Sequence, residues 1–482
     1  MRRPPARETE AGHVPEPHPA LAARVDAPLA TLVALHVLDR VEQGHEAPYV
    51  LARAARRATL PAQQRARPVE LVYGALRSLN RLDQAVGEAV RGEAPRLEPW
   101  RRQFLRLAAL LGERGEPLDR LLPWASALAG DRDRRRDAER QAPLAARAAR
   151  AFLARPPTLA LEDEALRTGH PAWFVERARA LLGREARALL DANNAEPPLV
   201  VRANALKTTR EGLAEALRAE GFAATPTRFS PLGLEVAPKE GAFRSRAFHE
   251  GLFEAQDEGS QVLGLLLGAQ PGEWVLDACA GAGGKTLLLA AQMENKGRLI
   301  ALDTHAGRLL ELKRRAGRAG AENYEAFVVD EQGELMGGAK ELRRDGAGRA
   351  RLPRPDYHRV LVDAPCSGLG TLRRTPELRW RHHPAQLATW PARQRAILEA
   401  NAPRVKPGGR LVYGTCSILR EENEDVVAGF LRDHAEFRLV AAQAALPAGL
   451  PPGLADEAGF LRLWPHRHGT EGYAAAVLER AA

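Results

Sequence analysis

Glu273-Trp-Val-Leu-Asp277 runs directly into Ala-Cys-Ala-Gly-Ala-Gly-Gly-Lys285-Thr286, and this stretch sets the architecture of the C-terminal half of the chain. Its first part is a short apolar run that predicts a buried strand, and residues 286–292 predict the helix that follows. A glycine-rich turn between a strand and a helix lets a ligand approach the backbone closely. The stretch therefore predicts the first β/α unit of a sheet that binds a ligand at the carboxyl ends of its strands.

The glycine loop matches neither common phosphate-binding motif. When Gly284-Lys285-Thr286 is aligned with the end of G-x-x-x-x-G-K-[ST], Cys279 stands where the first glycine belongs. In the dinucleotide pattern G-x-G-x-x-G, Gly281 and Gly283 would be followed by a threonine in place of the last glycine. The loop alone is a weak indication of a nucleotide-type ligand, and acidic residues at other strand ends strengthen it.

Regular alternation of strands and helices follows the loop. The pattern predicts strands over 298–303, 324–330, 358–363 and 410–414, and helices over 306–319 and 386–402. Five strands that alternate with helices predict a doubly wound, mainly parallel α/β sheet of the Rossmann-like kind. Asp303 and Asp330 end the second and third strands. The first is placed to accept hydrogen bonds from ribose hydroxyls, and the second could reach a base.

All three cysteines of the chain, Cys279, Cys366 and Cys416, lie just past predicted strands. A single free cysteine is usually a small buried hydrophobic residue. Cys366, in Asp363-Ala-Pro-Cys366, and Cys416 follow two strands that we expect to be neighbours, which makes burial alone a poorer explanation. Two thiols beside a carboxylate can form a disulfide in an oxidoreductase, or one thiolate can attack an electron-poor ring while a second group handles protons. The residues themselves leave both chemistries open.

The rest of the chain predicts three further regions before the α/β domain, which occupies residues 256–482. Residues 1–24 are rich in Pro, Ala and Arg without periodicity, which predicts a disordered tail. Residues 25–163 repeat apolar positions at helical spacing and are broken by Pro and Gly, which predicts an all-α bundle. Residues 164–255 predict a small α+β module, including a helix that a capping box at Thr208 opens.

Composition bounds the partners and the compartment. The chain has 482 residues and a formal net charge of +9, which favours an anionic partner such as nucleic acid. Because 63 of the 70 basic residues are arginine, part of this charge reflects composition rather than a binding patch. Three cysteines cannot make a disulfide framework, no apolar stretch approaches the ~20 residues of a membrane span, and no signal peptide is visible. We therefore expect a cytoplasmic protein that needs no membrane and no metal.

Taken together, the motifs resemble those of the Sun-family RNA 5-methylcytosine methyltransferases, which use S-adenosylmethionine. The resemblance rests on Asp277-Ala-Cys-Ala-x-x-Gly-Gly-Lys-Thr286, Asp363-Ala-Pro-Cys-Ser-Gly368, Arg373-Arg-x-Pro-Glu-Leu-x-Trp380, Lys406-Pro-Gly-Gly-x-Leu-Val-Tyr-x-Thr-Cys-Ser417 and Glu421-Glu-Asn423. Upstream, residues 189–204 and 256–261 resemble the family's RNA-binding module and the start of its catalytic domain. The N-terminal helices, with Glu70-Leu-Val-Tyr-Gly-Ala-Leu-Arg77, are similar to the NusB-like domain of ribosomal RNA small subunit methyltransferase B.

The resemblance implies a role for each matching residue. Cys416 is the nucleophile that adds to C6 of the target cytosine, and Cys366 assists its later release through proton transfer. Asp363 hydrogen-bonds the cytosine edge and also counts with the cofactor site. S-adenosylmethionine is held by the glycine loop and by two strand-end acids: Cys279, Ala280, Gly281, Ala282, Gly283, Gly284, Lys285, Asp303 and Asp330. The basic residues that would track RNA phosphates are Arg202, Arg373 and Arg374, for which a solvated surface role is an equal alternative.

The chain departs from the family pattern in three places. Gly281-Ala282 replaces the usual Ala-Pro of the glycine loop, and we expect cofactor binding to survive because the small residues remain. The excursion over 333–355 is longer than we expect for the family. The C-terminal Gly-x-Asp-Gly-Phe-Phe pattern appears as Gly469-Thr-Glu471-Gly-Tyr473-Ala, so the details of substrate contact there stay open.

The leading prediction is an RNA cytosine-C5 methyltransferase that acts as a monomer on 16S ribosomal RNA, or on another RNA such as tRNA. A non-catalytic RNA-binding protein that kept the fold is disfavoured by the intact Cys366, Cys416 and Asp363. A thiol redox enzyme is disfavoured because the chain has no Cys-x-x-Cys. DNA cytosine methyltransferases place their nucleophile in a Pro-Cys equivalent to Cys366, whereas the additional Cys416 and the upstream module favour RNA.

Overall fold

The structure is a computed structural model that describes most of the chain. The described residues are 29–58, 60, 64–90, 99–116, 163–330, 333, 335–338, 343–344, 350–352 and 356–482. The expected tail over 1–24 therefore lies outside them, as do parts of the expected helical domain and of the excursion over 333–355. Contacts divide the described chain into unit 1, which extends to Gly183 and includes Thr375–Arg381, and unit 2, which holds the rest.

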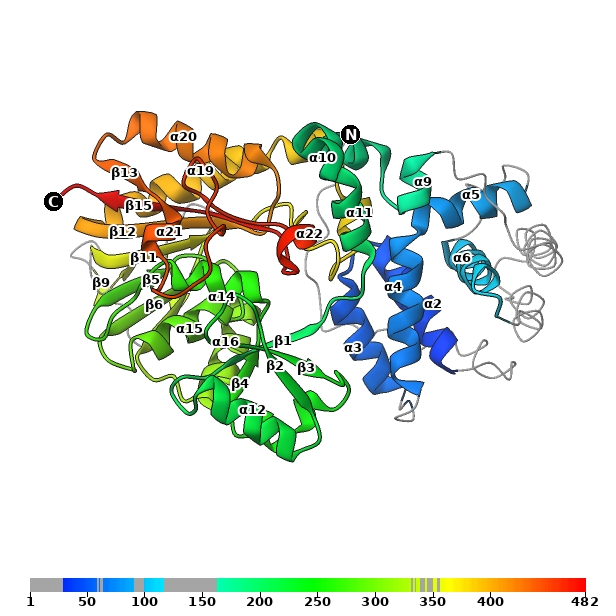
Figure 1. The fold of residues 1–482 in the computed structure, drawn as a ribbon, viewed down its shortest axis with the longest axis horizontal. Helices are drawn as coiled ribbons and strands as arrows, with labels where there is room; N and C mark the ends of the chain where they lie inside the picture. Colours follow the sequence, from blue (N-terminus) through cyan, green and yellow to red (C-terminus); the bar gives the residue numbers. More distant parts are fainter. Residues whose placement is uncertain are drawn as a thin grey trace. The chain divides into compact units, whose positions relative to one another are not determined.

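Unit 1 is an all-α bundle, as its helical periodicity predicts. Its helices are α2 (Leu29–Glu42), α3 (Ala47–Arg57), α4 (Ala66–Arg77), α5 (Leu79–Ala89), α6 (Pro99–Glu113), α9 (Glu164–Thr168), α10 (Ala172–Leu182) and α17 (Leu378–Arg381), of which α2 to α6 run from blue to cyan in Figure 1. One apolar core joins α2, α4, α5 and α6, with Val37, Leu71, Leu82 and Leu105 fully buried. This shared core stabilises helices that would be marginal in isolation.

A short segment from far along the chain, Thr375–Arg381, completes unit 1. Its Arg379 is fully buried and donates hydrogen bonds to the carbonyl oxygens of Arg77 (3.3 Å) and Gly169 (2.9 Å). Burial, together with the charge of Arg77, lowers the pKa of Arg379 to about 9. The segment carries most of the Arg373–Trp380 motif, so most of that motif serves the packing of the helical unit.

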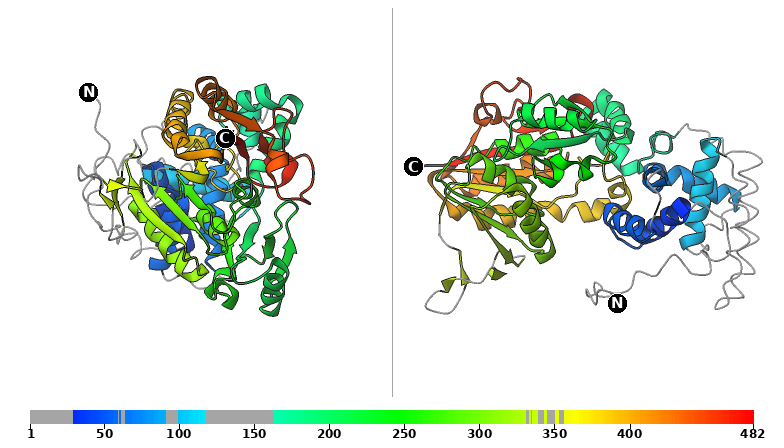
Figure 2. Two further views of the ribbon diagram at one scale, coloured as in Figure 1. Left: turned by 90° about the vertical axis from the view of Figure 1, so that its left-hand side faces the viewer. Right: turned by 90° about the horizontal axis from the view of Figure 1, so that it is seen from below.

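Within unit 2, a small antiparallel sheet and two helices form the expected α+β module, drawn in green in Figure 2. Its elements are β1 (Leu199–Ala203), α12 (Arg210–Ala219), β2 (Ala223–Pro226), β3 (Gly233–Ala237), α13 (Arg246–His249) and β4 (Phe253–Ala255), and the strand order is β2-β3-β1-β4. The predicted cap at Thr208 is wrong by one residue. Thr209 has the extended backbone that an N-cap needs, and its Oγ1 accepts a hydrogen bond from Gly212 N (3.0 Å).

The large sheet of unit 2 has the strand order β13-β15-β12-β11-β5-β6-β7-β8, and β14 pairs with β15. The strands are β5 (Trp274–Asp277), β6 (Arg298–Asp303), β7 (Tyr324–Val329), β8 (Leu335–Gly338), β11 (Tyr357–Asp363), β12 (Val405–Thr415), β13 (Phe437–Val440), β14 (Leu461–Leu463) and β15 (Tyr473–Arg480). The five predicted strands are confirmed and pair in parallel. The antiparallel β15, between β12 and β13, was not predicted. Separately, β9 (Arg343–Arg344) and β10 (Ala350–Arg351) pair with each other.

Helices cover both faces of this sheet (Figure 1). One face carries α14 (Glu258–Leu265), α15 (Gly284–Gln292) and α16 (Ala306–Ala319), and the other carries α19 (Trp390–Asn401) and α20 (Glu424–Asp433). Side chains alternate along each strand, so that Leu361 packs toward the first layer and Val360 toward the second. Further short helices are α11 (Ala186–Asn194), α18 (Pro384–Leu387), α21 (Ala442–Ala445) and α22 (Pro465–His468).

The single helix predicted over 386–402 is wrong, because the structure has α18 and α19 there. Pro391 lies in the first turn of α19, where its missing N–H costs nothing, and this position marks the start of a new helix. The strand order reverses between β5 and β11, because the chain moves to β6 and β7 on one side and to β11 and β12 on the other. Ligands of such sheets bind at the carboxyl edge beside this reversal.

We predict that the central strands carry much of the stability of unit 2. Leu361 is fully buried in β11, whereas Leu310 on α16 is 68% exposed. Leu361→Ala should lower the free energy of unfolding by about 2–5 kcal/mol through lost burial and a residual cavity. Leu310→Ala should change it by less than ~0.5 kcal/mol. Equal shifts of the urea-unfolding midpoint for the two variants would contradict this core.

Candidate active site

Two thiols meet at the carboxyl edge of the sheet. Cys366 follows β11 and Cys416 follows β12, and their Sγ atoms are 3.3 Å apart. Both are free cysteines of intermediate exposure. Because β11 and β12 pair in parallel, with Asp363 opposite Gly414, the residues that follow each strand reach the same place. The structure thus brings together the two thiols that the sequence places at neighbouring strand ends.

The surroundings of Cys366 favour its protonated thiol over its thiolate. The hydrogen bond with Cys416 is the largest cause that raises the pKa of Cys366 well above its usual value, followed by burial and by the charges of Cys416 and Glu422. A thiol with a raised pKa keeps its proton at neutral pH and is a poor nucleophile. As a thiol 3.3 Å from Cys416 Sγ, Cys366 can donate a hydrogen bond to that sulfur.

Asp363 ends β11, and the buried Lys285 holds its carboxylate. Lys285 Nζ donates to Asp363 Oδ2 (2.7 Å) and to Ser260 Oγ (2.9 Å), and it lies 5.8 Å from the centre of the Tyr473 ring. The side chain of Lys285 is 9% exposed and that of Asp363 is 28% exposed. Asp363 therefore offers a carboxylate in a fixed orientation that can still accept hydrogen bonds from a ligand.

The glycine loop turns between β5 and α15 with two residues in the left-handed region. Gly281 has a φ of 54° and Gly283 a φ of 88°. A Cβ at Gly283 would lie 2.2 Å from Leu312 Cδ1, so this position needs glycine. A Cβ at Gly281 would meet no atom within 4 Å, so the loop borders open space there. Gly281 N donates to Asp303 Oδ2 (2.9 Å), which ties the loop to the end of β6.

Asp303 and Asp330 lie at the ends of the neighbouring strands β6 and β7. The two oxygens of Asp303 accept backbone hydrogen bonds from Gly281 N and from His305 N (2.8 Å). A carboxylate has about four lone-pair sites, so Asp303 keeps capacity for a ligand hydroxyl. Asp330 directly follows β7 and is half-buried.

Models of known protein families match three parts of the chain. The matches are to "16S rRNA methyltransferase RsmB/F" over residues 264–479, to "Methyltr_RsmF/B-like, ferredoxin-like domain" over 170–239 and to "NusB family" over 30–110. Each matched range lies within one of the domains expected over 256–482, 164–255 and 25–163.

Relatives match over similar or greater lengths. "Probable ribosomal RNA small subunit methyltransferase B" of Bacillus subtilis is 30% identical over 450 residues, which are 92% of this chain and 96% of that protein. "Ribosomal RNA small subunit methyltransferase B" of Pseudomonas syringae pv. tomato is 32% identical over 321 residues, 66% of this chain and 68% of that protein. The crystal structure of PH0851 has a TM-score of 0.78 and 28% identity, and the match covers 95% of this chain and 100% of that chain. The chain belongs to the RsmB/F family of ribosomal RNA methyltransferases.

Membership in the RsmB/F family confirms the predicted resemblance and the predicted three-part fold. The three parts are a NusB-like helical bundle, a ferredoxin-like α+β module and a Rossmann-like methyltransferase domain with a mainly parallel sheet. Membership implies S-adenosylmethionine-dependent methylation of RNA, and so confirms the predicted cofactor. The residues fit this cofactor. Asp303 can accept hydrogen bonds from the cofactor's hydroxyl groups, and the glycine loop borders open space at Gly281. The negative charge of the strand-end carboxylates attracts the positive sulfonium of the cofactor.

Arg202 does not present its charge to RNA, so the predicted phosphate contact at this position is wrong. Arg202 is 2% exposed, and it donates to the Gly284 carbonyl oxygen (2.7 Å) and to Gln256. Burial lowers the pKa of Arg202 to about 9, although the charge of Glu254 opposes the shift. The sequence shows a basic residue on a strand but not which face of that strand is covered. Arg202 instead joins the ferredoxin-like module of this RsmB/F-family chain to the glycine loop.

Arg373 and Arg374 lie beside a buried pair of acids. Arg373 is 7% exposed and donates to the Gly469 carbonyl oxygen (2.7 Å), whereas the side chain of Arg374 is 41% exposed. Their Nε atoms are 3.5 and 3.6 Å from Glu471 Oε1. Asp257, which the sequence did not single out, accepts a hydrogen bond from Glu471 N (3.2 Å). Of the two arginines, Arg374 is the one accessible to a phosphate.

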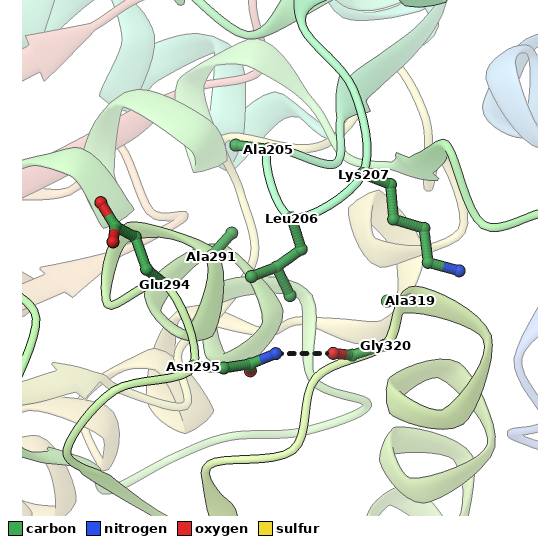
Figure 3. Close-up of a pocket in the computed structure, with 8 residues that line it drawn as sticks. All are labelled: Ala205, Leu206, Lys207, Ala291, Glu294, Asn295, Ala319 and Gly320. Atoms are coloured by element: carbon green, nitrogen blue, oxygen red, sulfur yellow. Dashed lines mark hydrogen bonds between the residues drawn. The ribbon is translucent and has the colours of Figure 1, made fainter.

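The pocket drawn in Figure 3 contains neither of the two thiols, nor Asp363, nor the glycine loop. It has a volume of about 410 Å³ and is lined by Ala205, Leu206, Lys207, Ala291, Glu294, Asn295, Ala319 and Gly320. It lies where α15 and α16 end, beside the turn that follows β1. Lys207 Nζ already donates to the carbonyl oxygens of Glu250 (2.8 Å) and Arg318 (2.7 Å). These bonds make Lys207 a link between the module and α16, so we do not assign the pocket to catalysis.

No group of three His, Cys, Asp or Glu side chains in the described ranges could hold a metal ion. In the same part of the chain, every helix is too short or too polar to cross a membrane.

We predict that Glu471→Gln changes the dependence of stability on pH. Burial and the charge of Asp257 raise the pKa of Glu471 from 4.5 to about 7, although Arg374 and Arg373 oppose the shift. Between about pH 4.5 and pH 7, the folded protein therefore binds a proton that the unfolded chain has lost. The free energy of unfolding of the wild type should fall as the pH rises through this range. An amide has no such cost, so the thermal midpoint of the variant should rise relative to the wild type between pH 5 and pH 8.

The control for this prediction is Glu457→Gln at an exposed position, whose midpoint should follow the wild type at every pH. Parallel pH curves for Glu471→Gln and the wild type would show that the ionisation of Glu471 does not limit stability.

Proposed function

We propose that the protein methylates C5 of a cytosine in 16S ribosomal RNA through a covalent bond between Cys416 and C6 of the base. The observation that carries this proposal is the pair of thiols 3.3 Å apart, with Asp363 at the end of the strand that leads to one of them. The family match and the names of the relatives support a small-subunit ribosomal RNA as the substrate.

The chemistry of cytosine explains why a thiol is needed. C5 is too poor in electrons to take a methyl group unaided. Addition of the Cys416 thiolate to C6 breaks the C5–C6 double bond and leaves C5 nucleophilic. S-adenosylmethionine supplies the methyl group that C5 takes. Removal of the C5 proton by a base then restores the double bond and expels Cys416 as a thiolate.

Asp363 is the residue that we propose to hold the target base. Its carboxylate can accept a hydrogen bond from the exocyclic amino group of cytosine, and Lys285 at 2.7 Å fixes its orientation. Uracil presents an oxygen at the same place, which would repel a carboxylate. Asp363 therefore favours cytosine over uracil.

Cys366 is the residue that we propose to assist release. Its raised pKa keeps a proton on its sulfur, and that sulfur lies within hydrogen-bond reach of Cys416. Its proton can stabilise the departing Cys416 thiolate as the bond to C6 breaks. Without Cys366, the methylated RNA should remain attached.

The target base must leave its stack to reach the two thiols, as in other enzymes that act on a base. The exposed guanidinium of Arg374 is the candidate for a phosphate contact beside the site. We also propose that the protein acts as a monomer and that it does so in the cytoplasm.

Two alternative functions differ from this proposal. A tRNA or another RNA could be the substrate of the same chemistry, since the site itself reads one base. A non-catalytic RNA-binding protein is a different class, and it would not require Cys366 and Cys416 at 3.3 Å or a carboxylate held by Lys285. Methylation assays on purified RNAs separate all three.

We predict opposite outcomes for the two cysteine variants with labelled S-adenosylmethionine and unmodified small-subunit RNA. Cys416→Ala should transfer no methyl group and form no covalent complex, because no thiolate adds to C6. Cys366→Ala should accumulate a covalent protein–RNA complex that survives denaturing electrophoresis. Methylation by Cys416→Ala, or loss of the complex in Cys366→Ala alone, would reverse the assigned roles.

We also predict that Asp303→Asn weakens cofactor binding. The variant removes the charge, and its amide nitrogen can accept none of the hydrogen bonds that a carboxylate oxygen accepts. Because a hydrogen bond to a charged group contributes ~1.5–3 kcal/mol, the dissociation constant for S-adenosylmethionine should rise about 10- to 100-fold by calorimetry. Asp433→Asn, at a side chain 69% exposed on α20, is the matched control and should bind as the wild type does. Equal affinities for both variants would remove Asp303 from the cofactor site.

A further inference from the structure

Glu422 is a buried carboxylate that neither the cofactor site nor the proposed chemistry uses. It lies in the 3-10 turn η8 (Arg420–Glu422) and is 1% exposed. Its Oε1 accepts from Ser367 Oγ (2.5 Å) and Ser417 Oγ (2.6 Å), and its Oε2 accepts from Ser367 N (2.9 Å) and Gln394 Nε2 (2.8 Å). Four hydrogen bonds satisfy the carboxylate, which is what allows a charge to stay buried.

The donors place this carboxylate between the two thiol loops. Ser367 directly follows Cys366, and Ser417 directly follows Cys416. The two serine Oγ atoms are also 3.2 Å from each other. One side chain therefore holds the residues next to both sulfurs, although the two cysteines are 50 positions apart in the chain.

Further bonds from the same turn fix the backbone on either side of Cys416. Asn423 Nδ2 donates to the carbonyl oxygens of Ser417 (3.0 Å) and Leu419 (2.7 Å), and Thr415 Oγ1 donates to Asn423 Oδ1 (2.6 Å). On the other loop, Gln394 Nε2 donates to the carbonyl oxygen of Pro365 (3.1 Å) as well as to Glu422. The residues that flank each sulfur are thus held from both directions.

We propose that Glu422 is a positioning residue that sets the separation of Cys366 and Cys416. Proton exchange between the two sulfurs needs hydrogen-bond distance, and a misplacement of ~1 Å can cost ~100-fold in rate. The inference rests on the proposed function, and it assigns a role to the motif Glu421-Glu-Asn423. The step that depends most on this separation is the release of methylated RNA from Cys416, because Cys366 acts there.

The test uses Glu422→Gln in the full chain, since this variant keeps the shape of the side chain. Its amide nitrogen would face two donors and leave at least one of them without an acceptor. We expect turnover to fall at least tenfold and the covalent protein–RNA complex to accumulate although both cysteines are present. Affinities for S-adenosylmethionine and for RNA should stay within twofold of wild type, which separates positioning from a loss of fold.

Two further variants calibrate this result. Ser417→Ala removes one of the four donors but leaves the others, so its turnover should lie between those of Glu422→Gln and the wild type. Glu399→Gln, on α19 with a side chain 45% exposed, is the matched control and should keep wild-type turnover. Turnover of Glu422→Gln within twofold of the control would overturn the proposal.

A second measurement reads the separation of the thiols without RNA. Diamide takes two electrons and two protons from a thiol pair, and the sulfurs join as a disulfide. Peptide mapping should show that the disulfide between Cys366 and Cys416 forms at least threefold more slowly in Glu422→Gln than in the wild type. An unchanged rate would refute the positioning role. Absence of methyl transfer to RNA by the wild type would instead refute the proposed function, and the rate of disulfide formation would still decide the role of Glu422.

Discussion

The parallel register between β11 and β12 is the constraint on which the site depends. Neighbouring strands lie ~4.8 Å apart, so residues that follow them at equal height are brought within contact distance. Asp363 stands opposite Gly414, and the loops that begin there carry Cys366 and Cys416 to a sulfur separation of 3.3 Å. The order of strands in the sheet therefore brings together two thiols that lie 50 residues apart in the sequence.

The last strand closes the same place from the other side. Gly472, directly before β15, donates its N–H to the Gly370 carbonyl oxygen (2.8 Å), and Gly370 N donates to the Cys416 carbonyl oxygen (2.9 Å). A Cβ at Gly370 would lie 2.2 Å from the Gly472 carbonyl oxygen, so the close approach of these loops requires glycine. The C-terminal segment therefore belongs to the site, although it lies far from either cysteine in the sequence.

Local patterns in the sequence predict most of the fold but few of the hydrogen bonds that join one loop to another. Short apolar runs between turn residues identify the five parallel strands, whereas Tyr473–Arg480 holds three consecutive alanines and few β-branched residues, so β15 escapes notice. The predicted phosphate contact of Arg202 is wrong because the burial of a strand residue depends on which elements cover that face of the strand. The motif around Glu422 is visible, but its partners Ser367 and Gln394 are distant, so only the structure reveals the carboxylate between them.

The central claim is that Cys416, and not Cys366, forms the bond to the base. RNA with 5-fluorocytidine at the target position tests it most directly. C5 of this base carries fluorine in place of the proton that a base must remove, so the covalent complex is trapped after methyl transfer. Digestion of the trapped wild-type complex and mass spectrometry should locate the nucleotide on the peptide that contains Cys416. A nucleotide attached to the peptide that contains Cys366 would contradict the account.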